Sequence, residues 1–262
     1  MSDRPVIRTL KAVEWVRAMN PGPESGGSEP HQFRCDDGLA YMVKASNNPQ
    51  KGRVLLNEAI GGLALDWLGV HHPAPAIVDL PAELLAASPG AKFGNGETLA
   101  AGLSYGSEYI HSEPQGTVPA DQLMNLSDIA GTMVFDTWIK NGDGRQYRLC
   151  ATKDDPRKYE FLPVDQGHSM AHDWTADAIK QQCGAQQVSL APEIRSLNGS
   201  DVRPYIDRLK TFDEATADHI ISQVPGAWFK GDDERTAVKD YLIQRAAHAA
   251  EVLNAKYPAA TA

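Results

Sequence analysis

Two aspartates flank a predicted β-hairpin, and together they could support phosphoryl transfer. Apolar runs at residues 148–151 and 159–164, separated by a charged, proline-containing turn, predict the hairpin. With the turn centred midway, Asp165 lies opposite about Gln146, and at ~3.3 Å per residue Asp143 is only ~10 Å further along the partner strand. One carboxylate could then accept the proton of a hydroxyl group while the other holds Mg²⁺ against nucleotide phosphates.

A lysine and a glutamate upstream are placed to hold the phosphates of a nucleotide. Lys44 ends a predicted strand and Glu58 falls in the helix predicted next, so the two could form an ion pair that directs the lysine toward phosphate oxygens. Taken separately, they have a plainer interpretation as a surface lysine and a solvated glutamate. Their positions relative to the strand and the helix favour the functional interpretation.

A glycine-rich loop between residues 20 and 30 could bring backbone N–H groups close to phosphate oxygens, because glycine has no side chain to keep a ligand away. The same composition is also that of an ordinary turn. The candidate phosphate contacts in this loop are Ser25, Gly26, Gly27 and Ser28.

Periodicity predicts the elements that must position these residues. Alternation predicts a strand at residues 6–18, and two short runs joined by Asp-Asp-Gly predict a hairpin over residues 32–44. Apolar side chains spaced by four, three and four predict a helix over residues 52–68, with Gly69 where a helix-ending glycine belongs. Prolines then favour extended backbone into a strand at residues 76–80.

The rest of the chain is predominantly helical apart from the central hairpin. Residues 81–99 are helix or loop, and the apolar stretch 99–110 leads into a linker that contains Pro and Gly. We place a boundary there, between a strand-rich lobe of residues 1–111 and a larger lobe of residues 112–262. Helices in the larger lobe are predicted at residues 120–140, 202–209, 214–224 and 234–253.

Composition excludes several classes of protein. The chain has 262 residues, 42% of them hydrophobic, which is enough for one large core or two lobes that share a cleft. A net charge of −9 opposes direct binding of nucleic acid or of anionic membranes. The three cysteines have no C-x-x-C spacing, and no run approaches the ~20 apolar residues of a membrane span. We therefore expect a soluble, cytoplasmic protein.

Several stretches of the sequence resemble one family of kinases. The pieces GGSEPHQFRCDDGLAYMVK, FDTWIKNGDGR, LPVDQGHSM and SQVPGAWF look like those of the compact HipA-like kinases, relatives of the HipA Ser/Thr kinases and, more distantly, of phosphatidylinositol kinases. The resemblance extends from about residue 8 to residue 255. It implies an α+β, two-lobed, protein-kinase-like fold that uses ATP and Mg²⁺ to phosphorylate a Ser or Thr hydroxyl, most simply that of a protein.

The resemblance also implies roles for individual residues. Lys44 would contact phosphates with Glu58 as its partner, Asp143 would be the catalytic base, and Asp165 would bind magnesium. The loop from Ser25 to Ser28 would be the phosphate loop. The hinge that receives adenine would be formed by Glu108, Tyr109 and Ile110. A small antitoxin or regulatory protein is the partner that such a family suggests.

One position departs from the family pattern. After the catalytic aspartate the family has Asp-Arg-His-x-x-Asn, whereas here Arg148 occupies the place of the asparagine that binds a second magnesium. A guanidinium group has no lone pair to offer a metal, but its N–H donors suit phosphate oxygens. A second frame, Asp136 with Asn141, has the same spacing, and Asn141 could also serve as a metal ligand.

Two other functions fit parts of the sequence. His168 and His172, with Asp165 and Asp173, would face one way on a helix and could bind a transition metal, as in a metal-dependent hydrolase. Arg148 also fits a regulatory pseudokinase, which binds nucleotide without transferring phosphate.

Overall fold

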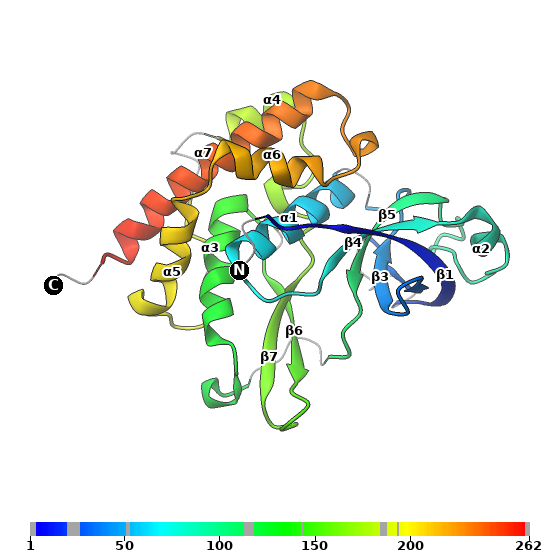
Figure 1. Ribbon diagram of the computed structural model, residues 1–262, viewed down its shortest axis with the longest axis horizontal. Helices are drawn as coiled ribbons and strands as arrows, with labels where there is room; N and C mark the ends of the chain where they lie inside the picture. Colours follow the sequence, from blue (N-terminus) through cyan, green and yellow to red (C-terminus); the bar gives the residue numbers. More distant parts are fainter. Residues whose placement is uncertain are drawn as a thin grey trace.

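The computed structural model describes residues 4–19, 27–50, 53–112, 118–142, 144–183, 188–192 and 194–259. Strands gather at one end of the molecule and helices at the other, with helix α1 between them and the hairpin β6–β7 projecting from the helical part (Figure 1). This is a mixed α and β fold with a strand-rich N-terminal part and a helical C-terminal part, as the sequence predicts.

Five strands in the N-terminal part form a closed barrel in the order β1-β2-β3-β5-β4. They are β1 (Arg8–Ala18), β2 (His31–Cys35), β3 (Ala40–Lys44), β4 (Pro75–Leu80) and β5 (Gly102–Glu108). The barrel interior is filled by apolar side chains, among them Phe33, Tyr41 and Val78. The predicted strands and the β2–β3 hairpin are confirmed, and Lys44 ends β3. The tight turn of that hairpin requires Gly38, whose φ is 82°.

Helix α1 (Val54–Leu68) joins the two parts of the molecule. All its residues except Asp66 are buried, and it contacts β4 and β5 on one side and α3, α5 and α6 on the other. It ends at Gly69, which is left-handed with φ 81°, as the sequence predicts. Its first turn is fixed by buried Arg53, which forms an ion pair with Glu234 and donates to the carbonyl of Trp174 at 3.4 Å.

The central hairpin consists of β6 (Gln146–Ala151) and β7 (Tyr159–Val164). Gln146 pairs with Val164 rather than with Asp165, so the predicted register was wrong by one residue. The reason lies in the turn, which is closed by a hydrogen bond from the N–H of Thr152 to the carbonyl of Lys158 at 2.8 Å. The loop then has seven residues, 152–158. Because this number is odd, the hairpin is centred on Asp155 and not between two residues, which shifts the register by one.

Helices build the C-terminal part around one large core. They are α3 (Leu126–Ile139), α4 (Ala176–Gln181), α5 (Gly199–Leu209), α6 (Glu214–Ser222) and α7 (Asp232–Lys256), with short α2 (Ala82–Ala86) in the N-terminal part. Single 3-10 turns are η1 (Ala120–Gln122), η2 (Ser169–Ala171) and η4 (Gly226–Trp228). Helix α3 begins six residues later than predicted, because η1 and an extended Leu123 precede it.

The end of α3 is held by α7. Arg245 is 1% exposed and donates to the carbonyls of Thr137, at 2.6 Å, and Trp138, at 3.0 Å. Carbonyls in the last turn of a helix have no partner within the helix, so these bonds satisfy them inside the core. The loop that carries Asn141 starts two residues after this point.

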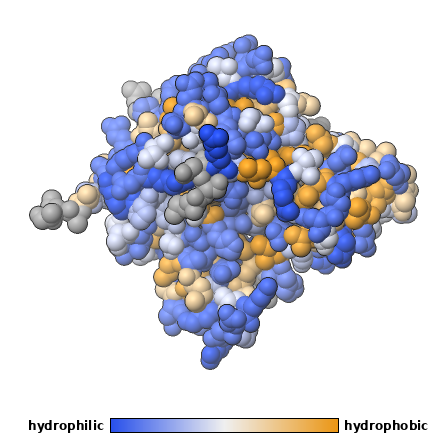
Figure 2. Space-filling model, viewed as in Figure 1, coloured by the Kyte–Doolittle hydropathy of each residue, from blue (hydrophilic) through white to orange (hydrophobic). Residues whose placement is uncertain are grey.

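Most of the face seen in Figure 2 is hydrophilic, and hydrophobic residues are most evident over the strand-rich part. Large apolar side chains exposed in the strand-rich part include Val13, Leu39 and Leu103. Across the described ranges, no helix is both long and apolar enough to span a membrane.

Gly131→Ala should destabilise the packing of α3. A Cβ at this position would lie 2.6 Å from both Tyr205 Cε1 and Val70 Cγ2, so the neighbouring elements must move apart. We expect a loss of about 1–3 kcal/mol in the free energy of unfolding, measured by urea titration. The control is Gly199→Ala, whose Cβ would have its nearest contact at 3.9 Å and which should be neutral or slightly stabilising. Equal stability of the two variants would contradict the packing described here.

Candidate active site

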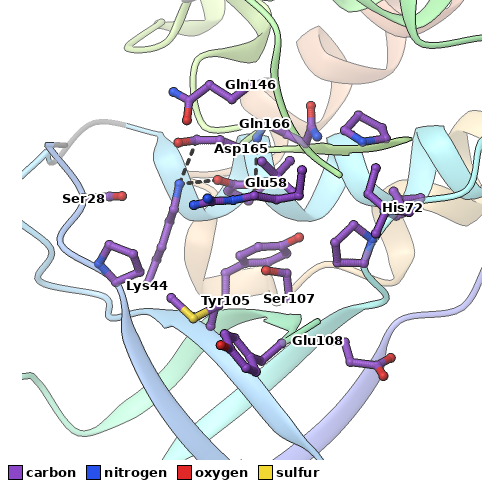
Figure 3. Close-up of a pocket in the computed structure, with 18 of the residues that line it drawn as sticks. Ser28, Lys44, Glu58, His72, Tyr105, Ser107, Glu108, Gln146, Asp165 and Gln166 are labelled. Carbon is purple, nitrogen blue, oxygen red and sulfur yellow. Dashed lines mark hydrogen bonds and ion pairs between the residues drawn. The ribbon is translucent and has the colours of Figure 1, made fainter. Parts of the chain in front are cut away.

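A cavity of about 470 Å³ lies where the barrel, α1 and the hairpin β6–β7 meet. Its lining includes Lys44, Glu58 and Asp165, which cluster in Figure 3, with Ser28 beside Lys44 on the left and His72 on the right. Tyr105 and Ser107 lie between. The volume is in the range of small-molecule sites.

Three charged side chains meet at the end of the cavity nearest Ser28. Lys44 Nζ forms an ion pair with Glu58 and another with Asp165 Oδ1 at 2.9 Å. The lysine comes from β3, the glutamate from α1 and the aspartate from the residue after β7. The ion pair that the sequence predicts between Lys44 and Glu58 is therefore present, and the structure adds Asp165 to it.

Burial and charge act in opposite directions on this cluster. Burial alone would lower the pKa of Lys44, but the carboxylates of Glu58 and Asp165 raise it, so the ammonium stays charged. Burial opposes ionisation of Asp165 as well, yet the neighbouring ammonium holds its pKa at about 2. The pKa of Glu58 is raised, because burial and the charge of Asp165 outweigh the attraction of Lys44.

The segment from Asp165 to Gly167 packs against one face of α1. The backbone N–H of Gln166 donates to Glu58 Oε2 at 2.9 Å, and Gly61 leaves room for the Gln166 side chain, because a Cβ there would lie 2.7 Å from that of Gln166. Asp165 itself has φ 60°, a left-handed conformation that Asp tolerates better than most residues. The turn therefore presents the Asp165 carboxylate to the cavity.

The phosphate-loop candidates are only partly described by the structure. Gly27 and Ser28 line the cavity, and Ser28 is buried. Ser25 and Gly26 lie outside the described residues. The N–H of Met19 donates to the carbonyl of Pro30 at 3.1 Å.

The predicted hinge lies at the opposite end of the cavity. Glu108, Tyr109 and Ile110 all line it, and the side chain of Glu108 points away from the other residues labelled in Figure 3. The N–H groups of Glu108 and Tyr109 already donate to the carbonyls of Ala74, at 2.9 Å, and Ala40, at 2.7 Å. A base bound here would therefore have to use the N–H of Ile110 or backbone carbonyls.

The predicted base, Asp143, lies outside the described residues, but its neighbours are described. The N–H of Gly142 donates to the carbonyl of His168 at 3.2 Å. Asp136 of the alternative frame is buried and paired with Arg145, whose Nε donates to it at 3.0 Å. This geometry gives Asp136 a structural role, which favours the frame that begins at Asp143.

Of the remaining sequence candidates, one lines the cavity and the other lies just after the end of α3. Arg148 lines the cavity, and its exposed guanidinium makes no hydrogen bond or ion pair with the rest of the described chain. Asn141 Nδ2 instead donates to Asp136 Oδ1 at 3.4 Å and is not part of the cavity wall. Its role as a metal ligand stays a prediction from the sequence.

The histidines considered for a metal hydrolase do not adopt the expected geometry. Their rings stack 4.1 Å apart, but the turn between them is 3-10, and Met170 and His172 have φ of 55° and 67°. Over the residues that the structure describes, no group of three or more His, Cys, Asp or Glu side chains is arranged to bind a metal. A site made of His168 and His172 on one helical face is not formed.

Sequence reasoning missed several residues of the site. His72 lines the cavity, and its Nε2 lies 3.1 Å from Asp66 Oδ1; Gln50 lines it near Gly27. Neither has a local motif. Gly61 had a detectable signal, because a glycine three residues after Glu58 lies on the same face of the helix.

Comparison with known proteins agrees with this architecture. The sequence model of the family described as HipA-like kinase matches residues 19–256. The structure is similar to that of the Helicobacter pylori proinflammatory kinase CtkA, with a TM-score of 0.58 and 12% identity over 95% of this chain and 97% of that one. At this identity the similarity shows a shared fold.

Weaker similarity extends to the Golgi casein kinase. Two of its crystal structures, one with Mn/ADP bound, match with a TM-score of 0.46 and 10% identity over 98% of this chain, and over 76% and 75% of theirs. No curated protein sequence matches significantly.

Asp165→Asn should make stability less sensitive to acid. The folded pKa of about 2 is below the ordinary ~3.9 of an unfolded aspartate, so this group stabilises the fold fully above about pH 4 and less as the pH falls toward 2. The variant should lose about 1–2 kcal/mol less than the wild type across that window, after allowance for partial exposure. Urea unfolding at a series of pH values measures this difference. The exposed Asp121→Asn is the control for removal of a carboxylate, and an unchanged slope for Asp165→Asn would refute the assignment.

Proposed function

The chain belongs to the HipA-like kinase family, and we propose that it transfers the terminal phosphate of ATP to a Ser or Thr hydroxyl of a protein. The observation that carries the proposal is the contact of Lys44 with both Glu58 and Asp165 inside the cavity. This cluster places the buried ammonium of Lys44 beside the partly exposed carboxylate of Asp165, at one end of a cavity large enough for a small molecule. In this proposal, residues 1–111 and 112–262 are the two lobes.

Lys44 would hold phosphate oxygens at the inner end of the cavity. An ammonium has three N–H donors, and the two carboxylates account for two of them. The third can be directed to an oxygen of the nucleotide. Since Glu58 and Asp165 fix the position of Nζ, little reorganisation is needed when the phosphate arrives.

Asp165 is the residue that would hold Mg²⁺. Its carboxylate is an oxygen donor, is 29% exposed and lies beside the phosphate end of the cavity, which fits a metal that is usually bound through one or two carboxylates and substrate phosphates. When bound, the ion neutralises charge on the phosphate oxygens. Among the described residues that line the cavity, the other carboxylates are Glu58, paired with Lys44, and Glu108, at the hinge end.

Asp143 would orient the acceptor hydroxyl and take its proton. The hydroxyl oxygen then bonds to the terminal phosphorus while the bond from phosphorus to the bridging oxygen of ADP breaks. Ser28 and Gly27 would lie over the phosphates, and the segment from Glu108 to Ile110 would receive adenine. A protein substrate and a small regulatory partner are the interactions that this proposal adds.

A second candidate function is nucleotide binding without transfer, and Arg148 is the observation that favours it. The side chain enters the cavity as an exposed guanidinium where the family pattern has a metal-binding asparagine. It could replace part of the charge of one magnesium ion but not its coordination. We favour a one-metal enzyme, because Lys44, Glu58 and Asp165 form a complete cluster.

Asp143→Asn should abolish most phosphoryl transfer and leave ATP binding nearly unchanged, because the base acts on the acceptor. Asp165→Asn should instead weaken binding of ATP in the presence of Mg²⁺, with little effect in its absence. Incorporation of labelled phosphate into protein extracts measures transfer, and isothermal titration measures binding. Wild-type protein that binds ATP but transfers nothing, with Asp143→Asn unchanged in both assays, would favour the second candidate.

Arg148→Asn should raise the number of magnesium ions that act with ATP. An asparagine oxygen can ligate a metal and a guanidinium cannot, so the rate should depend on magnesium with a steeper, two-site form. A magnesium titration of the rate at saturating ATP measures this, with the exposed Arg157→Asn as the control. If the wild type already shows two-site dependence, Arg148 does not occupy the position of a metal ligand.

A further inference from the structure

A side-chain bridge lies at the phosphate end of the cavity. The amide N–H of Gln50, on the segment between β3 and α1, donates to His168 Nε2, 118 residues further along the chain. Gln50 also lines the cavity, together with Gly27, Ser28 and Lys44. The bridge therefore joins the barrel side of the site to the segment that follows Asp165.

The same glutamine supports Gly27, a described residue of the predicted phosphate loop. A Cβ built on Gly27 would lie 3.3 Å from Gln50 Cγ and 3.5 Å from its Cδ, so the backbone of Gly27 rests directly on the glutamine side chain. A second contact fixes the residue after Ser28, since Glu29 Oε2 accepts from the N–H of Gly94 at 2.5 Å. The position of Gly27 relative to the cavity therefore depends in part on where the side chain of Gln50 is held.

His168 is itself fixed by the loop after Asp165 and by α1. Its ring stacks on His172 at 4.1 Å, and the carbonyl of His172 accepts from Asn57 of α1 at 2.9 Å. The carbonyl of His168 accepts from the N–H of Gly142, the residue before Asp143, at 3.2 Å. One residue thus contacts both the support of the phosphate loop and the segment that carries the proposed base.

We infer that Gln50 and His168 act as a pair of positioning residues that hold Gly27 and Ser28 over the terminal phosphates of a nucleoside triphosphate. The inference rests on the proposed function and deepens it. It assigns to Gln50 and His168 an effect on binding of the phosphates and none on binding of the base. Neither side chain takes part in bond making. Loss of either side chain leaves Gly27 and Ser28 without this support. Binding should therefore weaken more for a ligand that carries more phosphates.

Titration of adenosine, ADP and ATP, each with Mg²⁺, into the full chain tests the pair. Gln50→Ala and His168→Ala should each weaken ATP binding about tenfold, and the double variant no further, because either change alone breaks the bridge. Adenosine affinity should stay within about twofold, which also shows that the variants are folded. His168→Gln keeps a hydrogen-bonding side chain and should recover much of the loss. Gln223→Ala, at the end of α6, is the matched control.

The outcomes separate the two proposals. Equal weakening of all three ligands, additive effects in the double variant, or unchanged ATP affinity would each overturn the bridge while leaving nucleotide binding established. Failure of the wild type to bind any of the three ligands would overturn the proposed function, and the bridge with it.

Discussion

The ion cluster of Lys44, Glu58 and Asp165 is the interaction on which the site depends. A buried ammonium is costly unless carboxylates offset the loss of water, and here two of them do so from different elements. The cluster exists only when β3, α1 and the end of β7 are all in place. Its residues are separated in sequence by up to 121 positions. The site therefore forms only when these distant segments have folded against one another, and no single loop can form it.

Helix α1 meets this requirement because it is fixed on every side. Arg53 ties its start to α7, Gly61 admits Gln166, and Gly62 allows close approach of Pro75, whose Cβ would be 3.0 Å from an added methyl group. Side chains of the strand-rich part, such as Tyr105, belong to the same core as the C-terminal helices. Displacing α1 would therefore open the main core, so Glu58 is held against Lys44 by packing as well as by charge.

Local pattern predicted most of the fold and the charged centre of the site. The apolar spacing in α1 and its closing Gly69 placed Glu58, and the Asp-Asp-Gly turn placed Lys44 at a strand end. Side-chain pairing between distant segments left no such signal: neither the contact of Gln50 with His168 nor that of Arg145 with Asp136 has a repeat or motif. The hairpin register also depended on one hydrogen bond of Thr152, which determines whether the loop has an odd or even length.

The bonds from Arg245 to the end of α3 have a consequence for how the protein is made. A ribosome releases the chain from its N-terminus, and 107 residues separate Trp138 from the arginine that satisfies its carbonyl. These carbonyls in the last turn of α3 can gain their partner only once α7 has emerged and docked. Nascent chains would thus carry Lys44 and Glu58 long before the end of α3 is held in place, so synthesis of these side chains and completion of the C-terminal core are separated in time.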